Sequence, residues 1–201
     1  MGVSGEEEGW PPPDLAERRL PLVEGGLCAG PWCRTYRSSY DPVYFGRSRK
    51  ARFDDPEGEY GVLYAASDEF GAFIESFGRE PGKRRFFASQ LANRRLAVLG
   101  TWRELKLVDL RGSGLARLGA TGEMYSGRYE LSQAWSRALY EHSEEPDGIA
   151  YRLKHDPDRY GIALFERMSE DLVREREGVA LENDVSFRSE LRRIYDFRIV
   201  D

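Results

Sequence analysis

Hydrophobic positions along the chain predict strands and helices in alternation. Apolar runs and one stretch of alternating residues fit strands at 32–38, 62–66, 96–99, 105–110, 149–151 and 162–165, with a further one at 197–200. The runs at 96–99 and 105–110 are separated by little more than Gly100 to Arg103. We therefore expect these two strands to pair through a tight connection.

Three segments carry helical spacing. Ser67-Asp68-Glu69 provides a capping hydroxyl with acids in the first turn, and Phe70, Phe73, Ile74 and Phe77 follow at helical intervals. A second helix is predicted from an apolar stripe that repeats every three or four residues; its members are Leu131, Ala134, Trp135, Ala138 and Leu139. The charged segment 186–195 predicts a third helix. Trp135 on the stripe is expected in the core.

Strands and helices interleave without a strict repeat, which favours a mixed α/β (α+β) fold with a partly antiparallel sheet flanked by helices. Residues 1–30 contain a triple Glu, a triple Pro and a Gly pair. This composition resists regular structure, so we expect a poorly regular N-terminal arm lying on the body and outside the core. Residues 31–201 then form the domain.

Composition agrees with one globular domain. The 201 residues are 40% hydrophobic and 32% charged, with a formal net charge of −5. This acidic balance argues against direct nucleic-acid binding and against attraction to anionic membranes. No run of about 18 to 20 apolar residues would span a bilayer, and the acidic, proline-rich start is unlike a secretory signal. We expect a cytoplasmic protein.

Several familiar sites are excluded. The segment beginning Gly112-Ser113-Gly114 has an arginine where a dinucleotide fingerprint needs its third glycine, and no phosphate-binding loop ends in Lys-Ser or Lys-Thr. The chain has only two histidines, and Cys28 and Cys33 have none nearby. Neither a multi-histidine metal centre nor a zinc site fits, so we expect no metal and two buried or idle thiols.

The remaining chemistry rests on arginine, tyrosine, hydroxyl and carboxylate groups. Four of the 30 basic residues are lysines, so 26 are arginines, the side chain suited to paired hydrogen bonds with phosphate. Cleavage of the bond between nicotinamide and ribose in NAD needs such a set. Arginines clamp the pyrophosphate, a tyrosine offers a stacking face, and a carboxylate stabilises the positive charge that develops on the sugar.

Ordered pieces of the chain resemble a known family, the RES domain, named for an arginine, a glutamate and a serine. The resemblance covers about residues 34–166. Its pieces are Tyr36-Arg37, Arg52-Phe53-Asp54, residues 61–67 with Ala72 and Glu75, Val108-Asp109-Leu110, Gln133 with Trp135, residues 147–151 and residues 163–165. Their shared order and spacing carry the resemblance more than any single piece.

The resemblance implies a fold similar to that of ADP-ribosyltransferase toxins and NAD depletion by hydrolysis or phosphorolysis. It also implies a helix-turn-helix antitoxin that plugs the pocket. Two other functions stay open: transfer of ADP-ribose to a protein, and a degenerate domain that binds NAD without turnover. The oligomeric state also stays open, a homo-oligomer included.

Residue roles follow from the same resemblance. Arg37 and Arg52 would face the phosphates, with Tyr36 beside them in the NAD-binding set, and Tyr64 would line the nicotinamide ribose pocket. Glu75 would act at the sugar, and together with Arg52 it forms the predicted catalytic pair. His155 is expected to be a structural or surface histidine.

The chain departs from the family pattern where members carry a serine after the tyrosine that corresponds to Tyr151. Here Leu153 stands at that position. An isobutyl group cannot position a phosphate or a nucleophile, so activity would require a hydroxyl from elsewhere. The candidates are Ser126, Ser132 and Ser136.

Overall fold

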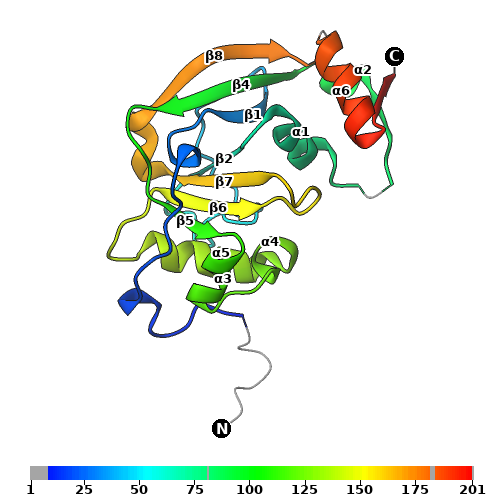
Figure 1. Ribbon diagram of the computed structural model, residues 1–201. Coiled ribbons are helices and arrows are strands. Elements are labelled where there is room, and N and C mark those ends of the chain that lie inside the picture. Colours follow the sequence, from blue (N-terminus) through cyan, green and yellow to red (C-terminus); the bar gives the residue numbers. More distant parts are fainter. Residues whose placement is uncertain (1–8, 81, 182–183, 201) are drawn as a thin grey trace.

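A seven-stranded sheet organises the molecule, and the computed structural model describes residues 9–80, 82–181 and 184–200 (Figure 1). The strand order is β5-β6-β7-β2-β1-β4-β8, and every neighbouring pair is antiparallel except β5 with β6. The strands are β1 (Trp32–Arg37), β2 (Val62–Ala66), β4 (Arg94–Thr101), β5 (Leu107–Leu110), β6 (Gly148–Arg152), β7 (Tyr160–Phe165) and β8 (Leu172–Ala180). A separate parallel pair joins β3 (Arg85–Phe87) to β9 (Arg198–Val200).

Helices flank this sheet. They are α1 (Glu69–Phe77), α2 (Ala88–Leu91), α3 (Ser113–Leu118), α4 (Glu123–Ser126), α5 (Tyr129–Tyr140) and α6 (Val185–Tyr195), with short 3-10 helices at Leu15–Glu17, Gly26–Cys28 and Glu166–Asp171. In Figure 1, α3, α4 and α5 gather beside β5, whereas α6 lies near β8. The predicted class, a mixed α/β fold with a partly antiparallel sheet and flanking helices, is confirmed. None of the described helices combines the length and apolarity needed to cross a membrane.

Two apolar clusters cover the two faces of the sheet. Along β2, Val62 and Ala66 belong to the cluster that also holds the buried side chains of α1 and α5, whereas Leu63 and Ala65 belong to the other. A central strand covered on both faces needs apolar residues at successive positions. This burial explains the continuous apolar run of β2 in the sequence.

The expected pairing of the strands at 96–99 and 105–110 is wrong. Both strands exist, but β4 lies between β1 and β8, and β5 lies at the opposite edge against β6. The connection is fixed by other contacts: Arg103 binds Asp147 through two 2.8 Å hydrogen bonds, and Leu105 N donates to Cys28 O. A short gap between two apolar runs therefore does not form a hairpin here.

The N-terminal segment is not outside the core. Leu15 and Leu20 belong to one apolar cluster, and Val23 and Cys28 belong to the other. The expectation that residues 1–30 stay out of the core is therefore wrong for the part that the structure describes. The segment is polar and rich in proline on average, but a few of its apolar side chains are buried in the core. Residues 1–8, with the triple Glu, lie outside the described residues.

The helix that carries Glu75 begins one residue later than the capping hydroxyl predicts. Asp68, not Ser67, caps α1: its carboxylate accepts a hydrogen bond from Gly71 N at 2.7 Å. Phe73 and Ile74 are buried, as their spacing predicts, and the Phe73 ring packs against Phe86, Phe187 and Phe197. Trp135 of α5 is fully buried, which confirms its place in the core.

A buried histidine fastens the N-terminal segment. His142 Nε2 lies 3.2 Å from Leu15 O and 3.1 Å from Arg18 O, and its Nδ1 accepts a hydrogen bond from Glu144 N. We expect His142→Ala to lower the free energy of unfolding by about 2 kcal/mol, since two carbonyl groups lose a buried partner. Urea denaturation would measure this loss. Glu17→Ala, at an exposed position of the same segment, is the control, and an equal effect of both variants would contradict the anchor.

Candidate functional site

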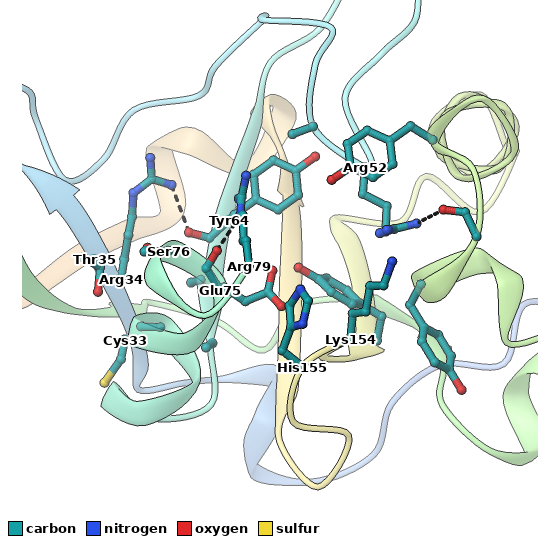
Figure 2. A pocket seen from close by; sticks show the side chains of 18 residues that line it. Cys33, Arg34, Thr35, Arg52, Tyr64, Glu75, Ser76, Arg79, Lys154 and His155 are labelled. Atoms are coloured by element: carbon teal, nitrogen blue, oxygen red, sulfur yellow. Dashed lines mark hydrogen bonds between the residues drawn. The ribbon is translucent and has the colours of Figure 1, made fainter. Parts of the chain in front are cut away.

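A cavity of about 500 Å³ opens where α1 faces β1, β2 and the start of α5 (Figure 2). This size lies in the range of small-molecule sites. Its lining residues are Cys33, Arg34, Thr35, Ala51, Arg52, Tyr64, Ala65, Ala66, Ala72, Glu75, Ser76, Arg79, Tyr125, Gly127, Tyr129, Tyr151, Lys154 and His155. Three of the predicted site residues, Arg52, Tyr64 and Glu75, therefore share one recess.

The charges around this cavity are mostly positive. Arg34, Arg52, Arg79 and Lys154 line it, whereas Glu75 is the one carboxylate among the described lining residues. The whole chain carries a net charge of −5, so the positive charge is local. Such a recess attracts an anionic ligand and retains one acid inside it.

Glu75 points from α1 into the cavity (Figure 2). Burial raises the pKa of its carboxyl group, and the nearby charges of Arg79 and Arg52 oppose that shift. Within the described part of the chain, no hydrogen bond to its carboxylate oxygens is found. A desolvated acid with a raised pKa in a cleft is typical of a functional group.

Arg52 is held at one end of the cavity. Its Nη1 donates to Gly127 O at 3.0 Å and to Ser132 Oγ at 3.3 Å, and the guanidinium carbon lies 4.6 Å from the centre of the Tyr129 ring. No hydrogen bond from its Nε or Nη2 is found among the described residues. These donors are available to a phosphate group.

Tyr36 and Arg37, which the sequence predicts in the NAD-binding set, do not line this cavity, so the structure does not bring them together with Arg52, Tyr64 and Glu75. Tyr36 packs against the apolar cluster on the other face of the sheet, and Arg37 is the exposed last residue of β1. Arg34 and Thr35 take their place. Arg34 and Arg37 lie three positions apart on a regular strand, so their side chains leave opposite faces of it: Arg34 shares a face with Tyr36, and Arg37 with Cys33.

The Arg34 guanidinium lacks a carboxylate partner in the described structure. It donates to the backbone oxygens of Tyr64, at 3.0 Å, and Tyr44, at 3.3 Å, while its Nε is buried without a partner. Burial lowers its pKa to about 10, which leaves it charged at neutral pH. Thr35 Oγ1 is likewise buried without a partner. Both atoms are enclosed by protein, so they do not face the open cavity.

Leu153 lies between Tyr151 and Lys154, which line the cavity, but its own side chain does not line it. Leu153 is fully buried in the apolar cluster and does not line the recess. Ser126, Ser132 and Ser136 do not line it either, although Ser132 holds Arg52 from behind. Apart from Tyr64, the residues with a hydroxyl group that line the cavity were not predicted; they are Thr35, Ser76, Tyr125, Tyr129 and Tyr151.

Two further lining residues correct or refine the sequence expectations. His155 lines the cavity instead of serving only the surface, and burial together with the charges of Lys154, Arg79 and Arg52 lowers its pKa. Cys33 also lines the cavity, and burial raises its pKa to about 11, so it is an un-ionised thiol at neutral pH. Both cysteines are buried, as expected. Among the described residues no group of three or more His, Cys, Asp or Glu side chains could hold a metal ion.

Known proteins are similar to this chain in sequence and in fold. The chain is 37% identical over 93 residues to the probable toxin y4kH of Sinorhizobium fredii (strain NBRC 101917 / NGR234), a match that covers 46% of this chain and 69% of that protein. The fold of the present chain is similar to that of a chain in the crystal structure of the M. tuberculosis MbcT-MbcA toxin-antitoxin complex. The TM-score is 0.64 at 16% identity, over 85% of this chain and 93% of the other.

The profile of the RES domain family matches residues 31–187, which include every residue that lines the cavity. That range also covers β1 to β8 and most of the helices. The resemblance stated from separate sequence pieces is thereby confirmed over most of the chain, and the protein belongs to the RES domain family.

Proposed function

We propose that this protein is a toxin that cleaves the bond between nicotinamide and ribose in NAD. The observation that carries the proposal is the desolvated carboxylate of Glu75 in a recess that otherwise carries arginine and lysine charges. A dinucleotide needs both features, because its pyrophosphate is anionic and its sugar becomes cationic during cleavage. Membership of the RES family and the relative named a probable toxin support the toxic role.

In the proposed reaction, the bond between C1 of the ribose and the ring nitrogen breaks, and its electron pair leaves with nicotinamide. The departing ring is neutral and needs no proton. Positive charge then spreads over C1 and the ring oxygen of the sugar, where the ionised Glu75 stabilises it. Water or inorganic phosphate adds to C1 and releases its surplus proton to solvent. Arg52 and Arg34 hold the pyrophosphate, and no step needs a metal.

The partner is also a proposal. We propose that an antitoxin, expected to be of the helix-turn-helix type, covers the mouth of the cavity, where Arg79 and Lys154 are exposed. The similar fold in a toxin-antitoxin complex supports an antitoxin partner. The cytoplasmic location and a homo-oligomeric state remain predictions.

A degenerate domain that binds NAD without turnover stays an alternative, because Leu153 supplies no hydroxyl group. Transfer of ADP-ribose to a protein remains the second reaction that the same recess could perform. Incubation with NAD distinguishes the reactions. Cleavage of free NAD releases nicotinamide together with ADP-ribose or its phosphate, whereas transfer to a protein releases nicotinamide and leaves a modified protein.

Glu75→Gln should reduce NAD cleavage by at least about 100-fold, because the amide cannot neutralise the charge on the sugar. Release of free nicotinamide, quantified by chromatography, measures the rate. Glu69→Gln, on the same helix but outside the cavity, should cleave NAD at the rate of the unaltered protein. Undiminished cleavage by the Glu75 variant would refute the role of this carboxylate.

The raised pKa of Glu75 also predicts how stability and activity depend on pH. A group whose pKa is raised by folding stabilises the fold fully below its ordinary pKa of 4.5 and loses that contribution as pH rises through the folded value. Glu75→Gln should therefore melt at the same or a slightly higher temperature than the unaltered protein at pH 7.5, and any difference in melting temperature should vanish near pH 4.

The rate of NAD cleavage by the unaltered protein should fall on acidification with a midpoint above pH 4.5. Calorimetry and pH-rate profiles test both expectations.

Arg34 and Arg37 provide a matched pair of variants on one strand. Arg34→Lys keeps the charge but loses the planar fork, so we expect NAD to bind about 10-fold more weakly. Arg37→Lys should bind NAD as the unaltered protein does, since Arg37 does not line the cavity. Titration calorimetry with NAD measures both affinities. The reverse order of effects would restore the assignment made from the sequence.

A further inference from the structure

The turn that presents Arg52 to the cavity is held by a buried carboxylate. Asp54 is only 2% exposed. Its Oδ2 accepts hydrogen bonds from Ser48 Oγ at 2.6 Å and from the backbone N–H groups of Lys50 and Ala51, both at 3.1 Å. No ion pair to this carboxylate is found in the described part of the chain, so hydrogen bonds stabilise the buried charge.

The hydroxyl of Tyr64 completes the arrangement. It donates to Asp54 Oδ1 at 3.0 Å and accepts a hydrogen bond from Phe53 N at 2.9 Å. Its single proton is thus engaged by Asp54, although the ring lines the cavity. Burial and the nearby Asp54 charge raise the pKa of this hydroxyl, so it stays protonated and able to donate. Tyr64 therefore offers its ring, and not its proton, to a ligand.

Helix α5 holds the same turn from the other side. Gln133 Nε2 donates to Ala51 O at 3.0 Å, and Ser136 Oγ donates to Phe53 O at 2.7 Å. The two neighbours of Arg52 in the chain are thus fixed at both their N–H and C=O groups. This leaves the backbone at Arg52 little freedom, and the guanidinium is directed at Gly127 O and the cavity.

We propose that Asp54 and the Tyr64 hydroxyl are positioning residues that act through Arg52. The backbone turn, and not a direct contact with the substrate, transmits their effect. The inference rests on the proposed function where it assigns Arg52 a role in NAD cleavage. A displacement of about 1 Å in a group that orients substrate can cost about 100-fold in rate, which is why a remote carboxylate matters to the reaction.

Three variants test the proposal. Asp54→Ala removes all the acceptors, and we expect kcat for NAD to fall about 10- to 100-fold. Asp54→Asn should restore part of the lost activity, because its carbonyl oxygen can still accept from Ala51 N, while its amide group can donate to the Tyr64 oxygen but cannot accept the Tyr64 proton. Tyr64→Phe should lower kcat in the same range, since Phe53 N loses its acceptor.

The control is Asp55→Ala. Asp55 is equally buried, but its carboxylate binds Arg137 and Glu59 N and does not contact the Arg52 turn. We expect this variant to lower the melting temperature and to retain kcat. Equal losses of kcat in the Asp54 and Asp55 variants would show a general effect on stability and overturn the proposal.

A double-mutant cycle then tests whether Asp54 acts through Arg52. In the Arg52→Ala background, Asp54→Ala should change the residual rate less than twofold, because the side chain that it positions is gone. An additive loss of 10-fold or more in that background would overturn the proposal. So would unchanged kcat in the single Asp54→Ala variant.

Amide hydrogen exchange makes the test independent of NAD. Exchange of residues 50–54 should accelerate at least 10-fold in Asp54→Ala and in Tyr64→Phe, and much less in Asp54→Asn. If the unaltered protein cleaves no NAD, the proposed function fails while this measurement still decides whether Asp54 fixes the turn. Exchange that is unchanged in Asp54→Ala would overturn the positioning role whether or not NAD is cleaved.

Discussion

Burial of β2 on both faces is the constraint on which the site depends. Val62 and Ala66 pack on one side and Leu63 and Ala65 on the other, so the strand has little freedom to slide or rotate. Two parts of the cavity are attached to it. Tyr64, in the middle of the strand, binds the turn of Arg52, and α1 follows two residues after the strand ends. The acid and the arginine are thereby held relative to one rigid element.

The charged groups around the cavity have no side-chain counter-ion bound to them among the described residues, and this determines the electrostatics of the site. Elsewhere on the molecule arginines pair with acids: Arg103 binds Asp147 and Asp171, and Arg137 binds Asp55. Around the cavity, by contrast, Arg34 hydrogen-bonds to backbone oxygens and Arg52 to a backbone oxygen and a serine. Charges left without a counter-ion retain the capacity to bind one. The same reasoning applies to Glu75, whose burial keeps it available for a cationic sugar.

Much of the fold could be predicted from the sequence because the hydrophobic period reports burial. The apolar run at β2 indicates a strand that is buried on both faces, and the stripe that includes Trp135 indicates a helix that is buried on one face. The edge strand β8 escaped prediction because Arg174, Glu175 and Arg176 face solvent and interrupt any apolar pattern. Strand partners also escaped, since β4 and β5 are adjacent in sequence but lie at distant positions in the sheet. Local pattern carries no information about such long-range choices.

The site could be predicted only where a residue type and its order were distinctive. Glu75, Arg52 and Tyr64 were placed correctly in one recess, whereas Arg34 was missed in favour of Arg37. Arg34 and Arg37 leave opposite faces of β1, and which parts of each face border the recess is a property of the whole fold. Asp54 was missed as a structural group because its three nearby donors, in residues 48–51, give it the pattern of any polar turn residue, and only the fold brings the Tyr64 hydroxyl to it.

The charged outer strand has a consequence for how the molecule behaves at high concentration. β8 ends the sheet, so one side of its backbone faces no further strand of the described sheet, and such a border can recruit strands from other molecules. Exposed Arg174, Glu175 and Arg176 make that growth unfavourable, because each added strand would have to desolvate them. Replacing this trio with valine or isoleucine would leave the recess intact but would convert the border into a seed for fibrous aggregates.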